Sequence, residues 1–490
     1  MLTRRALLTG GLGLAGALAL PGESVLYARG ATPGAGLPQR PPVSGGRIHD
    51  LTFTTGQHLR PDLVPAASKA PLWLYNNTLF PVVRVNLGDT LRARLENHLP
   101  EHTAMHWHGV RVPNAMDGVQ YITQPPIEPG ESFTYEFKPP DTGTFFFHSH
   151  CDGVQQMGRG LIGILLVDGD QPVPFDDEKV LVAKDWRLSK DGEWLPFETL
   201  DGAGRAGTFG TVRATNGVEA FSDTVPADGA VRMRILNLDS TRMMQVGVEG
   251  AEAFVIATDG NAITPFPLDT WKLGSAMRLD ILVRTPPAGK SFRILDYFAA
   301  EPWPIAAFTA KTQPRRWNAS QAIGLYAADV PKPDLASAQR LEFQFSAAAS
   351  GSAAAAAASQ LPPDDPLAKA LLDSQCIGSK GLWAINQVQW PNDGHRKLPP
   401  PLAVLERGRS YVFELMNATP HPHPIHLHGH TFTVLSASRQ KLPQFLADTV
   451  LLQPKERIQI AFVARPGDWM FHCHILEHQE HGMMGWIRVS

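Results

Sequence analysis

Cysteine and excess charge are both scarce in this sequence. Its 490 residues include only three cysteines, Cys151, Cys376 and Cys473. Three are too few for a fold built on disulfides. A single bridge between Cys151 and Cys376 stays open, because the sequence does not give their separation. The formal net charge is −3 and the pI is about 6.7, so there is no electrostatic reason to expect a nucleic-acid partner.

A long apolar run is also missing. The N-terminal run from Ala6 to Leu20 is weakly apolar and shorter than the roughly 20 residues that a membrane-spanning helix needs. It follows Arg4 and Arg5 in the string LTRRALL, which resembles a twin-arginine (Tat) export signal. We therefore predict that residues 1–44 are a Tat signal peptide and leader, that the Tat translocase exports the chain, and that the protein is periplasmic or secreted. A membrane anchor is the alternative, which the length of the run disfavours.

Glycine and proline, in contrast, are abundant, with 43 and 42 residues, as in β-rich proteins with many turns. Short alternating segments bounded by Gly, Pro and Asn, such as LRARLEN (91–97) and YVFELMN (411–417), indicate antiparallel strands. The region between them has the same patterning, for example VRMRILNL (231–238). We predict an all-β chain.

An internal repeat divides the chain. The segment from Asn86 to Val110 matches the segment from Glu406 to His430 at an offset of 320 residues, and TGTFFFHSH (142–150) matches PGDWMFHCH (466–474) at an offset of 324. The histidines that pair across the repeat are His106 with His426, His108 with His428, His148 with His472, and His150 with His474. Two parts of the chain therefore share one fold, and the region between them forms a third β-sandwich. That middle region contains no histidine from Cys151 to Gly394.

Of the 18 histidines, 15 fall in four clusters that each contain His-x-His. Residues i and i+2 of a strand point to the same face, about 6.6 Å apart along the chain, so each pair can serve one metal cluster. A single pair is weak support for a metal site, but four pairs across a repeat are hard to explain without one. Imidazole suits copper, zinc, iron and nickel alike, so the histidines alone do not identify the ion.

The stretch His472-Cys473-His474 identifies the ion as copper. Cys473 faces the opposite way from its two histidines, His478 follows Cys473 by five residues, and Met483 follows His478 by five. One thiolate, two histidines and a weak axial methionine describe a blue-copper electron-transfer site. His423 fits as the second histidine. The first copy of the repeat has Thr103 and Ser149 at the positions of His423 and Cys473, so only the second copy can hold this copper.

Together, HWHG (106–109), HSH (148–150), HPIHLHGH (423–430) and HCHILEHQEHGMM (472–484) resemble the four copper-binding motifs of the multicopper oxidases. The resemblance covers essentially the whole mature chain. It implies three cupredoxin-like Greek-key β-sandwich domains, at 45–170, 175–330 and 338–490, with a trinuclear copper cluster between the first and the third. It also implies four copper ions, and a small reducing substrate that gives up electrons for the reduction of O2 to water. We expect the protein to be a monomer.

The family motifs assign a ligand to each position that matches them. The type 1 copper takes His423, Cys473, His478 and Met483, and the type 2 copper takes His106 and His426. The resemblance assigns the type 3 pair as follows: His108, His148 and His474 on one copper, and His150, His428 and His472 on the other. The peptide links from Cys473 to its two neighbours then give a short covalent route between the copper centres.

Two acids are candidates for proton delivery, which the reduction of O2 requires. Asp117 is similar in position to the acid that serves bacterial members of the family. Glu480 is the second candidate, although the family's other acid would lie at Gln479, and this departure leaves the proton route open. For both, a solvated surface carboxylate is the alternative.

Phenols or aromatic amines, as for a laccase, are the expected substrates. A periplasmic cuprous oxidase for copper tolerance is the alternative, but the bacterial copper efflux oxidase carries a methionine-rich insertion where residues 340–400 contain no methionine. A two-domain nitrite reductase is disfavoured by the three domains. A non-catalytic cell-division or copper-carrier protein is disfavoured because no ligand is missing.

Overall fold

The structure is a computed structural model, and it describes residues 36–43, 45–298, 300–312, 324–347, 381–391 and 398–490. The twin arginine and Cys376 lie outside these residues, so the export signal stays a prediction and the question of a Cys151–Cys376 bridge stays open. No helix in the described part of the chain has the length and apolar character that crossing a membrane would require.

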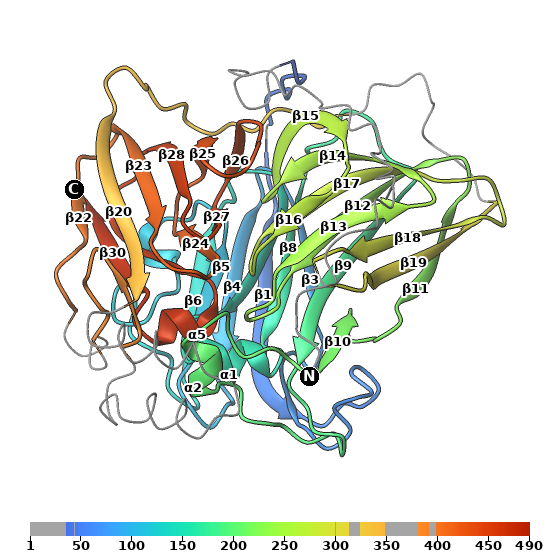
Figure 1. The fold of residues 1–490 in the computed structure, drawn as a ribbon, viewed down its shortest axis with the longest axis horizontal. Coiled ribbons are helices and arrows are strands. Elements are labelled where there is room, and N and C mark those ends of the chain that lie inside the picture. Colours follow the sequence, from blue (N-terminus) through green and yellow to red (C-terminus); the bar gives the residue numbers. More distant parts are fainter. Residues whose placement is uncertain (1–35, 44, 299, 313–323, 348–380, 392–397) are drawn as a thin grey trace, which may run out of the picture.

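The all-β prediction is confirmed: strands pair into six sheets within the described residues, two for each of three sandwiches (Figure 1). In the first sandwich (48–168), one sheet has the order β2 (Leu72–Tyr75), β1 (Ile48–His58), β4 (Thr90–Glu96), β6 (Ser132–Phe137). The facing sheet has the order β3 (Val82–Asn86), β8 (Ile162–Asp168), β7 (Gly143–Ser149), β5 (Met105–His108).

The strands of the second sandwich (177–311) contain no histidine. One sheet has the order β10 (Val212–Thr215), β9 (Asp177–Trp186), β12 (Ala230–Asn237), β17 (Arg278–Arg284), β14 (Glu252–Thr258), β15 (Asn261–Pro267). The other has the order β11 (Ser222–Pro226), β19 (Trp303–Lys311), β18 (Ser291–Asp296), β13 (Met244–Glu249), β16 (Trp271–Leu273).

The third sandwich (339–489) repeats the arrangement of the first around its own histidines. One sheet has the order β21 (Trp383–Ile385), β20 (Gln339–Ala347), β23 (Ser410–Asn417), β28 (Arg457–Val463), β25 (Phe432–Ala437), β26 (Phe445–Ala447). The other has the order β22 (Ala403–Leu405), β30 (Met484–Val489), β29 (Gly467–Cys473), β24 (His423–Leu427), β27 (Thr449–Leu452). Short helices join the strands: η1 (Asn114–Met116), α1 (Gly153–Gly158), α2 (Leu200–Ala203) and α5 (Leu476–Glu480).

Strand β7 shows how the sequence places the histidines at the boundary between sandwiches. All of its residues are buried, and alternate side chains enter different cores, as the two-residue period of a strand requires. Phe145 and Phe147 join the core of the first sandwich. Phe146 joins a core that also contains Leu236 and Leu476, from the second and third parts of the chain. His148 points to the same side as Phe146, and therefore toward the other sandwiches.

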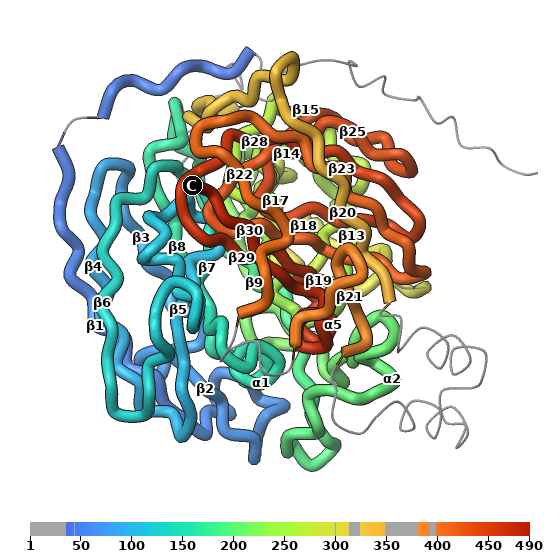
Figure 2. Tube along the Cα trace, turned by 90° about the vertical axis from the view of Figure 1, so that its left-hand side faces the viewer, coloured from blue at the N-terminus to red at the C-terminus, as the bar shows by residue number. Residues whose placement is uncertain are grey.

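The first and third sandwiches lie side by side, with α1 against α5 and η1 against β29 (Figure 2). In both sandwiches the two histidine strands pair in the same way. His106 is opposite His148 in the β5–β7 ladder, and His426 is opposite His472 in the β24–β29 ladder. The internal repeat is thus a structural repeat, with the histidine ladders of the two copies facing each other.

Candidate metal centres

The Cys473 side chain meets two histidines at the end of the third sandwich. Cys473 ends β29, His423 begins β24, and His478 lies on α5. The Nδ1 atoms of the two histidines are 3.0 Å apart, and Cys473 Sγ is 3.6 Å from His423 Nδ1 and 3.7 Å from His478 Nδ1. All three side chains are fully buried. They form the three-ligand group that the sequence predicts around Cys473.

Hydrogen bonds on the outer side of each ring show which nitrogen is free to bind a metal. His478 Nε2 donates to the Arg205 carbonyl at 2.8 Å, so its hydrogen is on Nε2. His423 Nε2 lies 2.8 Å from the hydroxyl of Thr419. That hydroxyl donates its own hydrogen to Asn417 Oδ1 at 2.8 Å, so it accepts a hydrogen from His423 Nε2. Both Nδ1 atoms therefore carry bare lone pairs that face each other. Two lone pairs at this distance repel unless a cation lies between them.

The ionisation of this group also fits a metal. Burial lowers the pKa of His423 to about 3 and that of His478 well below its usual value, so both rings are neutral. Burial raises the pKa of the Cys473 thiol, which makes a free thiolate costly without a cation beside it. A soft sulfur with two neutral imidazoles suits copper.

Met483 returns to the same place by two backbone hydrogen bonds. Its N–H donates to the His478 carbonyl at 2.8 Å, and its carbonyl accepts from the Cys473 N–H at 3.0 Å. The Met483 side chain is fully buried. Its role as axial ligand stays a prediction.

Met483→Leu is expected to raise the reduction potential of the blue copper while keeping the blue colour, because a thioether that favours Cu(II) is lost. A redox titration that follows the blue absorption measures this change. Met484→Leu, at the neighbouring buried methionine, is the matched control. An unchanged potential in the Met483 variant would contradict an axial ligand at this position.

The eight paired histidines meet in one buried cluster between the first and third sandwiches. None is more than 4% exposed, and rings from the two copies of the repeat pack face to face or tilted against each other. The ring centroids of His106 and His428 are 3.9 Å apart, and those of His108 and His426 are 3.8 Å apart. Nitrogens of His150, His428 and His472 lie within 4.8 Å of one another, the trio predicted for one type 3 copper. His108, His148 and His474 belong to the same cluster; their assignment to one copper stays a prediction.

Seven ring nitrogens of this cluster lack hydrogen-bond partners in the described structure: His106 Nε2, His108 Nδ1, both nitrogens of His150, and Nε2 of His148, His426 and His474. The Nε2 atoms of His428 and His472 lie 3.0 Å from each other. Four rings have a backbone carbonyl on the outer Nδ1: His106, His148, His426 and His472. That nitrogen therefore carries the hydrogen, and the inner nitrogen is bare.

Metal ions would satisfy these nitrogens. An unsatisfied buried polar atom costs about 1–3 kcal/mol, and this cluster contains several of them side by side. Protonation is not an alternative, because burial and the neighbouring rings lower the pKa of His108, His150 and His428 well below the usual value. The donor set, with imidazole nitrogens only, fits copper.

The first copy of the repeat has no counterpart of the Cys473 site, and the structure shows what replaces it. Thr103 Oγ1 and Ser149 Oγ lie 3.1 Å apart, and Thr103 also donates to Gln156 Oε1 at 2.8 Å. This pair of hydroxyls is satisfied without a metal. The asymmetry read from the sequence is thus visible as two different local chemistries on one scaffold.

Asp117, the first predicted proton carrier, touches both halves of the cluster. Its carbonyl accepts from His106 Nδ1 at 2.8 Å, and its Oδ2 accepts from His428 Nδ1 at 2.8 Å. The side chain is fully buried, and Oδ1 has no hydrogen-bond partner among the described residues. The alternative, that Asp117 is a solvated surface carboxylate, is therefore wrong.

Glu480, the second candidate, lies at the end of α5. Its Oε1 accepts from the Gly153 N–H at 3.2 Å. Glu480 lines a cavity together with Gln120, His150, Asp152 and Gln479. The cavity thus reaches a cluster histidine, and the role of Glu480 stays a prediction.

His430 belongs to the HLHGH motif but is not among the residues that the family motifs assign as ligands. Its Nδ1 donates to the His428 carbonyl at 2.9 Å, and its Nε2 accepts from the Arg465 N–H at 2.9 Å. Both nitrogens are occupied by the backbone, so His430 has none left for a metal.

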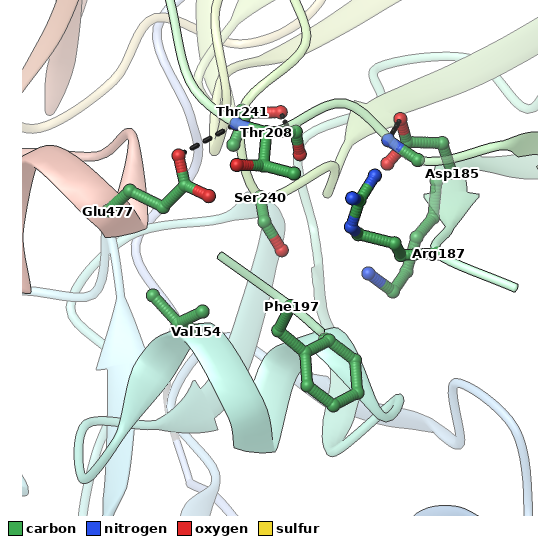
Figure 3. A pocket seen from close by; sticks show the side chains of 11 residues that line it. Val154, Asp185, Arg187, Phe197, Thr208, Ser240, Thr241 and Glu477 are labelled. Atoms are coloured by element: carbon green, nitrogen blue, oxygen red, sulfur yellow. Dashed lines mark hydrogen bonds between the residues drawn. The ribbon is translucent and has the colours of Figure 1, made fainter. Parts of the chain in front are cut away.

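Several residues of the site were missed by the sequence analysis. Glu477, next to His478, is buried, and burial raises its pKa to about 7. Its Oε2 accepts from the Thr208 N–H at 2.7 Å, at the edge of a pocket that Val154, Phe197 and Ser240 also line (Figure 3). Its position in the copper-binding motif, between Leu476 and His478, was the feature of the sequence that could have indicated a role. Ser275, whose hydroxyl lies 3.3 Å from His474 Nδ1, was also missed. So were Asp448, 3.0 Å from His108 Nε2, and its partner Arg278, because nothing in the sequence shows that these residues reach the cluster.

Fold and site together define a class: an all-β copper protein with a cysteine-containing mononuclear site and a histidine cluster. Multicopper oxidase family models match residues 60–172, 188–311 and 378–490. A solved multi-copper oxidase from Pseudomonas thermotolerans is 32% identical with a TM-score of 0.78, covering 91% of this chain and 100% of that one. The chain belongs to the multicopper oxidase family.

Two curated relatives extend the comparison. Multicopper oxidase MmcO of Mycobacterium tuberculosis is 27% identical over 440 residues, 84% of this chain and 81% of that protein. A laccase of Cryphonectria parasitica is 26% identical over 488 residues, 89% of this chain and 81% of that protein. The protein is therefore an oxidase that binds four copper ions, and it oxidises a reducing substrate with O2 as the acceptor.

Proposed function

We propose that this oxidase is laccase-like and takes single electrons from phenols or aromatic amines at His478. The observation that carries the proposal is the surrounding of that ring. The Trp383 indole lies tilted over His478 with ring centroids 4.5 Å apart, and the outer nitrogen of His478 donates to the Arg205 carbonyl. Trp383 Nε1 in turn donates to the Ala203 carbonyl at 2.7 Å. An indole and backbone carbonyls suit a neutral aromatic donor better than a soft metal ion.

In this proposal the copper ligands are those that the family motifs assign. His423, Cys473, His478 and Met483 hold the type 1 ion, and His106 with His426 hold the type 2 ion. The type 3 pair is held by the remaining cluster histidines: His108, His148 and His474, and His150, His428 and His472. When bound, the copper ions supply one-electron chemistry and the capacity to give O2 its four electrons together.

The chain's own residues fix the geometry for that chemistry. Backbone carbonyls hold the cluster rings with their bare nitrogens inward, and Cys473 spans the two centres because its neighbours point the opposite way. Asp117 is proposed to hand protons to the cluster through its unpartnered Oδ1, and Glu480 to serve the cavity beside His150. We infer that the protein acts as a monomer.

A cuprous oxidase is the second candidate. Cu(I) would need soft donors near His478, and the described contacts of that ring outside the ligand set are a carbonyl and an indole. Residues 348–380 and 392–397 lie outside the described part, and they contain no methionine.

Steady-state oxidation of a phenol, an aromatic amine and Cu(I) by the copper-loaded protein separates the two candidates. We expect kcat/KM for the phenol or the amine to exceed that for Cu(I) by at least about tenfold, a difference of about 1.4 kcal/mol in transition-state stabilisation. A larger kcat/KM for Cu(I) would favour the cuprous oxidase. As a check on access to His478, Trp383→Leu should lower kcat/KM for aromatic donors more than for an outer-sphere inorganic reductant.

Export rests on the sequence alone. We propose that the Tat translocase carries the folded chain out of the cytoplasm, on the basis of Arg4 and Arg5 before a short apolar run. Replacing both arginines by lysine and locating the protein by fractionation tests this; an unchanged location would refute it.

A further inference from the structure

A second aspartate repeats the contacts of Asp117 on the opposite side of the cluster. The carbonyl of Asp117 accepts from His106 Nδ1, and its carboxylate accepts from His428, a residue of the other sandwich. The carbonyl of Asp448 accepts from His426 Nδ1 at 2.8 Å, and its carboxylate accepts from His108 Nε2 at 3.0 Å. Each aspartate thus holds one histidine of its own sandwich and one of the other.

The two carboxylates differ in what else they meet. Asp117 Oδ1 has no hydrogen-bond partner in the described structure and lies 3.4 Å from His106 Nδ1. The two terminal nitrogens of the buried Arg278 guanidinium donate to the Asp448 carboxylate, at 2.8 Å to Oδ1 and 2.6 Å to Oδ2. The Thr449 hydroxyl also donates to Asp448 Oδ1 at 2.8 Å. Charge-assisted bidentate bonds of this kind fix a carboxylate in both charge and orientation.

Arg278 begins β17 and belongs to the second sandwich, which has no copper ligand. It is fully buried, and its backbone N–H donates to Asp259 Oδ1 at 2.8 Å. Asp259 Oδ2 accepts in turn from the backbone of Asp448 and Thr449, at 3.3 Å and 3.2 Å. Gly109, of the HWHG motif, has a positive φ of 82°, and a Cβ there would overlap the guanidinium and the Asp448 carboxylate. The approach of these groups to His108 therefore depends on that glycine.

We propose that Asp448 is a positioning residue of the copper cluster, oriented by Arg278 from the second sandwich, and that it is not a proton carrier. Its carboxylate keeps the hydrogen of His108 on Nε2, which leaves the unpartnered Nδ1 facing the cluster. Arg278 neutralises the Asp448 carboxylate and donates a hydrogen bond to each of its oxygens, so neither oxygen is free to carry a proton. The middle sandwich thereby takes part in holding the cluster. This inference rests on the proposed ligand assignment.

The test compares Asp448→Asn with a matched control, Asp170→Asn. Asp170 also forms a buried pair with an arginine, 2.7 Å from Arg232, but no hydrogen bond or ion pair joins it to a histidine in the described structure. The copper-loaded proteins are dialysed against a chelator, and copper per chain, the EPR spectrum of the type 2 copper and the blue absorption are measured. An asparagine amide cannot accept both hydrogen bonds of the Arg278 guanidinium, so its oxygen is no longer fixed toward His108. Loss of such an oriented hydrogen-bond partner of a metal ligand weakens metal binding about 10- to 100-fold.

We expect Asp448→Asn to lose cluster copper and to alter the type 2 spectrum while the blue absorption persists. Asp170→Asn should keep all of these even if its melting temperature falls. Arg278→Lys keeps the charge but cannot form the two parallel hydrogen bonds to Asp448. Its copper content after dialysis should lie between those of the wild type and of Asp448→Asn. The pH profile of the residual rate should keep its wild-type shape in Asp448→Asn.

Full copper retention with an unaltered spectrum in Asp448→Asn would overturn the proposal, and so would a displaced pH profile, which would mean proton transfer. Loss of the blue absorption together with cluster copper would also overturn it, because a general loss of structure would then explain the result. Failure of the ligand assignment itself would show differently, as a wild-type chain that binds no cluster copper.

Discussion

Replacing Cys473 by serine is expected to abolish the blue absorption and to reduce substrate oxidation to the background rate. The thiolate is the soft ligand of the mononuclear site, and the serine hydroxyl does not replace it. The sulfur lies 3.6 Å and 3.7 Å from the two Nδ1 atoms of that site, and the residues on both sides of it belong to the cluster. One change therefore removes both the electron acceptor and its link to O2. Visible spectroscopy and oxygen uptake measure the two effects.

Cys151→Ser is the matched control, since Cys151 is the other buried cysteine among the described residues. It should keep both the colour and the activity. The repeat supplies a structural precedent for the serine variant, because Ser149 occupies the matching position of the first sandwich and is hydrogen-bonded to Thr103. A blue and active Cys473→Ser protein would refute the mononuclear site.

Asp117→Asn is expected to slow the reduction of O2 by about 10²- to 10⁴-fold, the usual contribution of a general acid. The amide oxygen can still accept from His428 Nδ1, so the ring keeps its orientation, but the amide has no acidic proton to deliver. Reduction of the blue copper by substrate should be unchanged, because the histidines that donate to Asp117 in the described structure, His106 and His428, belong to the cluster and not to the Cys473 site. Stopped-flow spectroscopy separates these two half-reactions.

Asp141→Asn serves as the control for the loss of a buried carboxylate in the same sandwich. Asp141 pairs with Arg111 at 2.7 Å and lies outside the cluster, so its variant should reoxidise at the normal rate. Equal slowing of both half-reactions in Asp117→Asn would refute the proton role and point to a change in structure.

The internal repeat made most of this architecture predictable. Four His-x-His pairs at matching offsets required two similar β-sandwiches with their histidines on one side, and the structure packs His106 against His428 and His108 against His426. Cys473 was predictable because a strand alternates its side chains, so one residue had to face away from its two neighbours.

The supporting residues were not predictable in the same way. Arg278 and Asp448 are 170 residues apart, and no spacing rule brings a strand start in one sandwich to a β26–β27 junction in another. Glu477 sits within a motif, but whether its side chain faces solvent or the interior depends on how α5 packs against the 199–208 segment. Such contacts arise from the docking of sandwiches, which leaves no periodic signal in the sequence.

The central claim is that electrons taken up at the Cys473 site reduce O2 completely at the histidine cluster. It is tested most directly by bleaching the copper-loaded protein with substrate without oxygen, then adding a measured amount of O2 and assaying for hydrogen peroxide. We expect that the blue colour returns, that each O2 consumes the electrons of four one-electron donors, and that no peroxide is released. Recovery of the colour with peroxide formed at two electrons per O2, or no recovery at all, would contradict it.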